Sequence, residues 1–309
     1  MNSRKSAIRF LFLLPVLLTS LLACAAPETT PAPAGGVTDQ LGRTIRLDRV
    51  PERIVSLAPT STEILFALGL GDKVAGVTDY CDYPPEAKTK PSVGGYSNPS
   101  LEKLVAFAPD LVLVDDIHIK TVLPQLESRG ITALGIDAES LEQMLEAISL
   151  VGSMTGKSKE AASLVQGLQS RIKSVTGKTA GLPVEQRPTV FYPVWPDPLM
   201  AGGAGTLHDE LVTQAGGRNV AGSLSGYASI SLESVLQANP QVMVASVGHG
   251  TGEDAPFQFI NNEARLSGTE ARKNNRVYQI DGNLTSRGGP RLVDGLEAMA
   301  RLLHPELFD

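Results

Sequence analysis

Residues that could carry out catalysis or hold a metal ion occur in the sequence, but not in the spacings that this chemistry needs. No His-x-x-x-His pair and no Gly-x-Ser-x-Gly nucleophile motif is present. The glycine-rich stretch 202–206 lacks the lysine of a phosphate-binding loop, so we interpret it as the turn before a helix at 207–215. Of the histidines, His249 is the best placed to be a single ligand, and a structural role is its simpler interpretation. We therefore expect no catalysis, no metal site and no resident cofactor.

Aromatic side chains are the residues best suited to recognise a ligand. They make up only 5% of the chain, yet Tyr80, Tyr83 and Tyr96 fall in one Pro- and Gly-rich stretch. The single tryptophan, Trp195, lies among three prolines. Aromatic rings on loops suit a large planar or amphipathic ligand. The alternative is that these rings pack beneath the loops, and Tyr83, which precedes two prolines, is the best candidate for that role.

The sequence contains two copies of the helix–strand unit that should help to position these side chains. Residues 100–114 and 231–245 share Ser, Leu, Glu and Pro at a constant offset of 131 positions, and apolar residues match between them. In each copy the serine is suited to cap a helix, the proline ends that helix, and the following apolar run predicts a buried strand. The repeat predicts two similar lobes, with Glu102 and Glu233 at the second helical position of equivalent helices.

A second pair of matching stretches supports the duplication and locates an insertion. Residues 63–69 match 210–216 and, after a one-residue gap, 74–76 match 220–222, where the offset between the copies is 15 positions larger than the offset of the Ser-Leu-Glu unit. The first lobe therefore carries 15 extra residues between Gly76 and Ser100, in the stretch that holds the three tyrosines. Long loops of this kind more often carry function than plain connections do.

The N-terminus has the features of an export signal. Three basic residues precede an apolar run at 10–22 that is too short to span a membrane, and the stretch Leu-Leu-Ala-Cys at 21–24 resembles a lipobox. Ordinary secretory cleavage after Ala23 or Ala26 is the alternative. The predicted segments are a signal peptide at 1–23, and a lipidated Cys24 with a flexible tether at 24–36.

Composition narrows the class of protein further. A chain of 309 residues is long enough for two domains with their own cores. The net charge is −6 and no basic run occurs, so nucleic acid is not an expected partner. Once Cys24 is lipidated, Cys81 is the only cysteine left, so no internal disulfide can form. We interpret Cys81 as a free thiol, and contact with a bound metal complex is the alternative.

The order of the expected elements predicts two Rossmann-like α/β lobes. Short apolar runs that predict strands alternate with helical patterns through the first lobe, which indicates a mostly parallel sheet covered by helices. A purely helical pattern then follows without a strand, so one long helix, or two abutting ones, would join the lobes. A cleft between the lobes would face the carboxyl ends of the strands, where open α/β sheets bind ligands. The predicted divisions are a first lobe at 37–139, a joining helix at 140–178 and a second lobe at 179–309.

With these residues in view, the chain resembles the periplasmic binding proteins of ABC importers for cobalamin and iron complexes. The matching stretches cover nearly all of the mature chain. The stretch 77–85, which contains Tyr-Cys-Asp-Tyr-Pro-Pro, resembles the cobalamin branch in particular. The other matching stretches are 53–59 with Thr62 and Glu63, both Ser-Leu-Glu units, and 286–291.

The resemblance implies roles for individual residues. Glu102 and Glu233 fall on the positions that dock into arginine pockets of a two-fold symmetric permease; the alternative is that each only favours its helix N-terminus. Asn283, Leu284 and Thr285 depart from the family member compared, which has an acidic residue and aromatics there, and Tyr96 replaces a tryptophan. The expected ligand-binding residues are Tyr80, Asp82, Tyr96, Trp195, Asn283, Leu284, Thr285, Ser286 and Arg287.

The resemblance also implies a function. An exported, lipid-anchored monomer would capture a cobalt corrinoid in the cleft and hand it to an ABC importer permease, with little hinge closure because a long helix limits bending. One alternative is an iron complex as ligand, a ferric siderophore or haem, whose negative charge would face Arg287, Arg291 and Arg218. Another is an enzyme or metal-cluster protein on the same fold, which would need bridging cysteines that the sequence lacks. A role as a surface adhesin has no support in the sequence.

Overall fold

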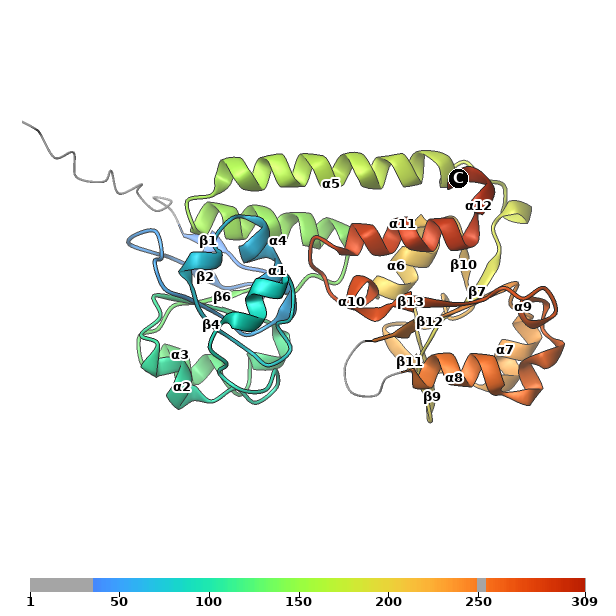
Figure 1. The fold of residues 1–309 in the computed structure, drawn as a ribbon, viewed down its shortest axis with the longest axis horizontal. Coiled ribbons are helices and arrows are strands. Elements are labelled where there is room, and N and C mark those ends of the chain that lie inside the picture. Colours follow the sequence, from blue (N-terminus) through green and yellow to red (C-terminus); the bar gives the residue numbers. More distant parts are fainter. Residues whose placement is uncertain (1–35, 249–253, 309) are drawn as a thin grey trace, which may run out of the picture.

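The computed structural model describes residues 36–248 and 254–308 (Figure 1). Four parallel strands form the sheet of the first lobe. Their order is β4-β3-β5-β6. The predicted signal peptide, Cys24, the tether up to residue 35, and His249 lie outside the described residues. The strands are β3 (Ile54–Ser56), β4 (Val74–Val77), β5 (Leu111–Val114) and β6 (Ala133–Gly135), with a small hairpin of β1 (Val37–Thr38) and β2 (Thr44–Ile45) beside them. The helices are α1 (Pro59–Ala67), α2 (Leu101–Ala106) and α3 (Leu123–Glu127).

The second lobe repeats this sheet. Its four parallel strands run in the order β10-β7-β12-β13, and a three-stranded antiparallel sheet, β11-β9-β8, is added to it. The strands are β7 (Thr189–Phe191), β8 (Pro193–Pro196), β9 (Leu199–Gly202), β10 (Arg218–Asn219), β11 (Tyr227–Ser229), β12 (Val242–Val247) and β13 (Val277–Asp281). The helices are α6 (Leu207–Gln214), α7 (Leu232–Ala238), α8 (Ala255–Asn262), α9 (Glu270–Lys273), α10 (Gly282–Thr285), α11 (Leu292–Leu303) and α12 (Pro305–Phe308).

The two Ser-Leu-Glu units occupy equivalent places in the two lobes. Ser100 caps α2 by accepting the backbone N–H of Lys103, and Ser231 caps α7 by accepting that of Ser234. The strands that follow, β5 and β12, are third in their sheets. The prediction of two Rossmann-like lobes with mostly parallel sheets is therefore confirmed.

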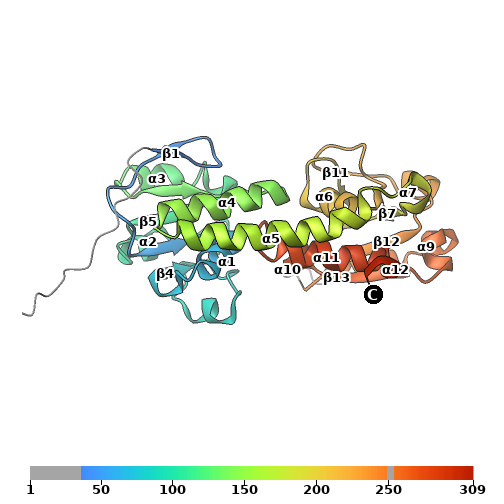
Figure 2. The ribbon, with the colours of Figure 1, turned by 90° about the horizontal axis from the view of Figure 1, so that it is seen from above.

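The joining segment consists of two helices that form a hairpin. α4 (Leu141–Met154) packs against α5 (Ser158–Thr179), and α5 alone extends over both lobes (Figures 1 and 2). Between them Gly156 has a φ of +73°, a conformation that glycine adopts without steric cost, and it allows the chain to reverse. The structure has two helices over 140–178 rather than a single long one, which is the second of the two arrangements expected; helical periodicity alone does not reveal the reversal of direction between them.

The lobes share one apolar core. A single cluster of buried side chains includes Ile54 and Leu113 of the first sheet, Leu168 of α5, Val244 of the second sheet and Leu296 of α11. Each sheet packs a separate cluster on its other face, so each lobe has three layers. Opening the lobes widely would expose part of the shared cluster, which makes large hinge motion costly.

Two further properties concern only the described residues. No helix within them combines the length and the apolar character that a membrane span requires. In the same residues, no group of three or more His, Cys, Asp or Glu side chains is arranged to hold a metal ion.

Candidate binding cleft

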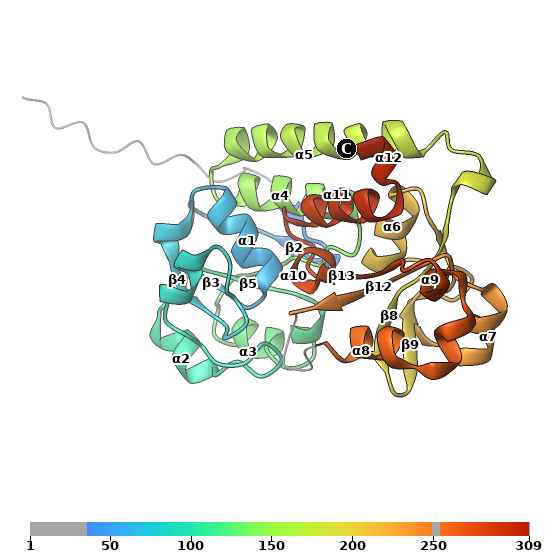
Figure 3. The same cartoon turned by 45° about the vertical axis from the view of Figure 1, so that its right-hand side comes forward.

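A cavity of about 180 Å³ lies between the lobes. The first lobe contributes residues that follow the carboxyl ends of β5 and β6, among them Asp116 and Asp137, together with Tyr96 of the inserted loop. The second lobe contributes Tyr227 and Ser286 from the opposite side. In Figure 3 the arrowhead of β12 points toward the first lobe, so the ligand-binding edges of the two sheets face each other as the fold class predicts.

Hydrogen bonds with Asp115 and His118 hold Tyr96 in place. Its hydroxyl donates to Asp115 Oδ2 at 2.5 Å, and its carbonyl lies 2.7 Å from Nε2 of the fully buried His118. The Nδ1 atom of His118 lies 2.7 Å from Asp115 Oδ1, which closes the network. Burial and the neighbouring Asp115 carboxylate raise the pKa of Tyr96 well above its ordinary value. Tyr96 is therefore an oriented, neutral phenol at the cavity wall.

Three carboxylates line the first-lobe side of the cavity, and no sequence motif indicated them. Asp116 and Glu139 are exposed, and Asp137 is half-buried between them. Burial, followed by the charges of Asp116, Glu139 and Asp115, raises the pKa of Asp137 to about 6. The positions of these residues in the sequence could have indicated them. Asp115 and Asp116 directly follow β5 and Asp137 closely follows β6, at the strand ends where α/β sheets bind ligands.

The aromatic ring on the second-lobe wall is Tyr227. Its side chain is 49% exposed, and its hydroxyl lies 3.2 Å from His208 Nδ1. Burial and the charge of Glu139, across the cavity, raise the pKa of Tyr227 to about 12. Trp195, the ring expected from sequence, lies on the β8–β9 hairpin and donates from Nε1 to the carbonyl of Asp197. It is not among the residues that line this cavity.

The stretch 283–287 is divided between the cavity and the interior. Ser286 lines the cavity. Thr285 is fully buried, 3.0 Å from the hydroxyl of Tyr192, and Asn283 donates to the carbonyl of Gly248. Leu284 is half-buried. Tyr80 is 46% exposed and, like these three residues, is not among the residues that line the cavity. Their contact with a ligand stays a prediction.

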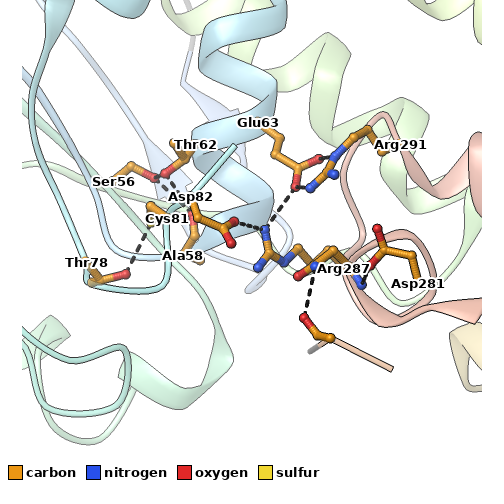
Figure 4. A network of polar contacts seen from close by, with 12 residues as sticks. Ser56, Ala58, Thr62, Glu63, Thr78, Cys81, Asp82, Asp281, Arg287 and Arg291 are labelled. Atoms are coloured by element: carbon orange, nitrogen blue, oxygen red, sulfur yellow. Dashed lines mark hydrogen bonds and ion pairs between the residues drawn. The ribbon is translucent and has the colours of Figure 1, made fainter. Parts of the chain in front are cut away.

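Asp82 and Arg287, two expected ligand contacts, bind each other across the lobes (Figure 4). The Asp82 Oδ1 to Arg287 Nη1 distance is 2.6 Å, and Arg287 is only 6% exposed. Burial opposes ionisation of Asp82, but the hydrogen bond and charge of Arg287 outweigh it and lower the pKa of this carboxyl. Glu63 on α1 accepts from Arg291 at 2.6 Å and lies 3.4 Å from Arg287. We call these four residues the inter-lobe network.

The arginines that were expected to face an anionic ligand already contact other groups of the protein. The guanidinium of Arg291 stacks over the Tyr83 ring, 3.6 Å from its centroid, in addition to its ion pair with Glu63. Arg218, on β10, donates to the carbonyl of Arg187. The geometry therefore gives Arg287, Arg291 and Arg218 partners within the protein itself.

Cys81 is buried at 3% exposure, with its sulfur 3.2 Å from the Thr78 hydroxyl (Figure 4). Burial raises the pKa of the thiol, although hydrogen bonds from Thr62 and Thr78 partly oppose this. It does not line the cavity, so the interpretation as a structural free thiol is the simpler one.

Replacement of Gly288 by alanine should force the lobes apart. A Cβ atom at Gly288 would lie 2.1 Å from the carbonyl oxygen of Ala138 in the first lobe, far inside van der Waals contact. We expect a loss of about 1–3 kcal/mol of unfolding free energy, measured by urea denaturation. Gly268→Ala is the control, because its Cβ would meet open space. Equal stabilities of the two variants would contradict the close approach.

Comparison with known proteins shows which proteins share this arrangement. Residues 54–284 match the sequence profile of the periplasmic binding protein family. The chain belongs to this family. It is 32% identical over 277 residues to an uncharacterized ABC transporter substrate-binding lipoprotein, YvrC, of Bacillus subtilis, covering 88% of this chain and 86% of that protein. It is 31% identical over 244 residues to the vitamin B12-binding protein of Salmonella choleraesuis, covering 78% and 86%.

The fold comparison agrees with the family. The periplasmic haem-binding protein RhuT of Roseiflexus sp. RS-1, in apo form, superimposes with a TM-score of 0.73 at 25% identity, covering 83% of this chain and 99% of RhuT. The predicted family is therefore confirmed. The chain is a periplasmic binding protein of the ABC transporter family, and its relatives are substrate-binding proteins rather than enzymes.

Proposed function

We propose that this protein is an exported, lipid-anchored monomer that captures a corrinoid between its lobes and delivers it to an ABC importer permease. The observation that carries the ligand class is the pair of tyrosines, Tyr96 and Tyr227, one on each side of the cavity. A flat macrocycle offers a face or an edge to each ring, and such contacts are favourable for aromatic side chains. The Salmonella relative is a vitamin B12-binding protein, which supports the same ligand class.

Haem is the second candidate, because RhuT shares the fold and is named for haem binding. Haem carries two propionate groups, and their recognition needs cationic side chains. Arg287 and Arg291 are instead paired with Glu63 and Asp82. The pairing of these arginines favours the corrinoid over haem.

Delivery is proposed to depend on Glu102 and Glu233. Both side chains are exposed, and both lie at the second position of the equivalent helices α2 and α7. These helices lie on the side of the lobes that faces away from α5 (Figures 1 and 3). One carboxylate per lobe suits a permease built from two symmetric subunits.

Equilibrium binding tests the proposed ligand. The chain from residue 25 onward, which lacks Cys24 and so carries no lipid, is titrated with cyanocobalamin, cobinamide, haem and a ferric siderophore by calorimetry or fluorescence. We expect at least one corrinoid to bind with a Kd of about 1 μM or tighter, corresponding to about −8 kcal/mol. Failure of both corrinoids to bind at submillimolar concentration would overturn the corrinoid assignment, and tighter binding of haem would replace it.

A further inference from the structure

We infer that the cleft selects its ligand by charge, taking planar ligands that are cationic in preference to neutral ones and rejecting anionic ones. This inference rests on the proposed function for the location of the site. It goes beyond that proposal by naming Asp116, Asp137 and Glu139 as the residues that determine specificity.

The first observation is the charge of the cavity wall. Asp116, Asp137 and Glu139 all line the cavity, and Asp115 lies directly behind Tyr96. Among the described residues that line the cavity, none is Lys, Arg or His. The carboxylates of the first-lobe wall therefore act on a bound ligand without a compensating positive charge from the described lining residues.

The second observation concerns Arg287 and Arg291 and is independent of the first. Arg287 is buried and directed at Asp82 and Glu63, and Arg291 is paired with Glu63. Turning either guanidinium toward the cavity would remove one of the two cationic partners of Glu63, whose side chain is only 2% exposed. An uncompensated buried charge is costly, so these arginines are not free to neutralise an anionic ligand.

The consequence for ligands follows from their formal charges. A cobalt(III) corrin with one cyanide carries a charge of +1, and the phosphate of a complete cobalamin cancels it. Haem carries two carboxylates. Charges on a ligand within a few ångströms of the wall interact appreciably even in a partly hydrated cleft. A corrinoid without its nucleotide is therefore the preferred member of the proposed ligand class.

The affinity for a cationic ligand should depend on pH through the same cavity carboxylates. The charged groups that act on Asp137 are Asp115, Asp116 and Glu139 from its own lobe, while Tyr96 and Tyr227, which line the same cavity, stay neutral. Because the pKa of Asp137 is about 6, the wall loses one negative charge between pH 7.5 and pH 5. Cation affinity should fall with decreasing pH over this window, and Asp137→Asn should remove the transition near pH 6.

The decisive experiment compares matched probes. The monocyano form of cobinamide, which carries the +1 charge, is compared with cyanocobalamin, and a tetracationic N-methylpyridyl porphyrin with a tetra-anionic sulfonatophenyl porphyrin. In each pair we expect the more positive ligand to bind about tenfold more tightly or better, a difference that the variant Asp116→Asn/Asp137→Asn/Glu139→Gln should abolish. The charge-matched control, Asp48→Asn/Glu146→Gln/Glu185→Gln, changes three exposed carboxylates that do not line the cavity and should keep the preference.

The outcomes separate this inference from the proposed function. Corrinoid binding with no preference between the members of either pair, or a preference that survives the triple change, overturns the charge inference and leaves the proposed function intact. Failure of both corrinoids overturns the corrinoid assignment of the proposed function, while the porphyrin pair still decides the charge inference. Binding of none of the four probes overturns both.

Discussion

Replacing Glu102 and Glu233 together by alanine should abolish permease-dependent uptake while the affinity for the ligand stays unchanged. The two carboxylates are exposed at equivalent positions of α2 and α7, and neither lines the cavity between the lobes. Truncating one partner of a charge pair that becomes buried at an interface costs about 2–5 kcal/mol, so loss of two pairs should remove productive docking. Ligand uptake by cells and binding of the purified protein to its reconstituted permease measure the effect.

The control replaces Glu146 and Glu185, which are also exposed, by alanine. It removes the same charge from other surfaces and should leave uptake intact. Normal uptake by the Glu102→Ala/Glu233→Ala variant would refute docking through these residues. A loss of ligand affinity in that variant would assign them to ligand binding instead.

Glu63→Gln should lower the unfolding free energy by about 3 kcal/mol. Glu63 is 2% exposed and receives hydrogen bonds from Arg291 at 2.6 and 3.1 Å, with Arg287 at 3.4 Å. Loss of its charge leaves two largely buried guanidinium groups with only Asp82, itself 40% exposed, to balance them. Urea denaturation at pH 7 measures the change, and the variant should also show easier separation of the lobes by small-angle scattering.

Glu52→Gln provides the comparison for this variant. Glu52 pairs with Lys73 at 3.1 Å, but its side chain is 66% exposed, and exposed ion pairs contribute little to stability. Similar stabilities of the two variants would show that the inter-lobe network does not hold the lobes together.

The features predictable from sequence were those set by local interactions. A serine cap at Ser100 or Ser231 and an apolar run after a proline act within one unit of the chain, so the duplicated lobes could be predicted from the repeat alone. Reversal of the chain at Gly156 depends on how α4 packs against α5, and periodicity along a single helix carries no such information. The pattern was therefore compatible with one helix or with two.

The chemistry of the site depended on tertiary contacts and was predicted less well. Family resemblance indicated Asp82 and Arg287 as ligand contacts, but the pairing of these two residues is visible only once the lobes are assembled. Tyr227 lies in a short edge strand without a recognisable motif, and Asp137 is one of many acidic residues. The 15-residue insertion did locate Tyr96, because its position relative to the repeat differs between the lobes.

Because α5 and the shared core fix the lobes relative to each other, they also fix the distance between α2 and α7. With docking through Glu102 and Glu233, engagement of the first carboxylate presents the second one to its receptor pocket at a high effective concentration. That gain exists only when the span between the two carboxylates equals the span between the two pockets. The helix that joins the lobes would therefore set the distance between the two docking carboxylates, and the permease would recognise its partner by this distance as well as by charge.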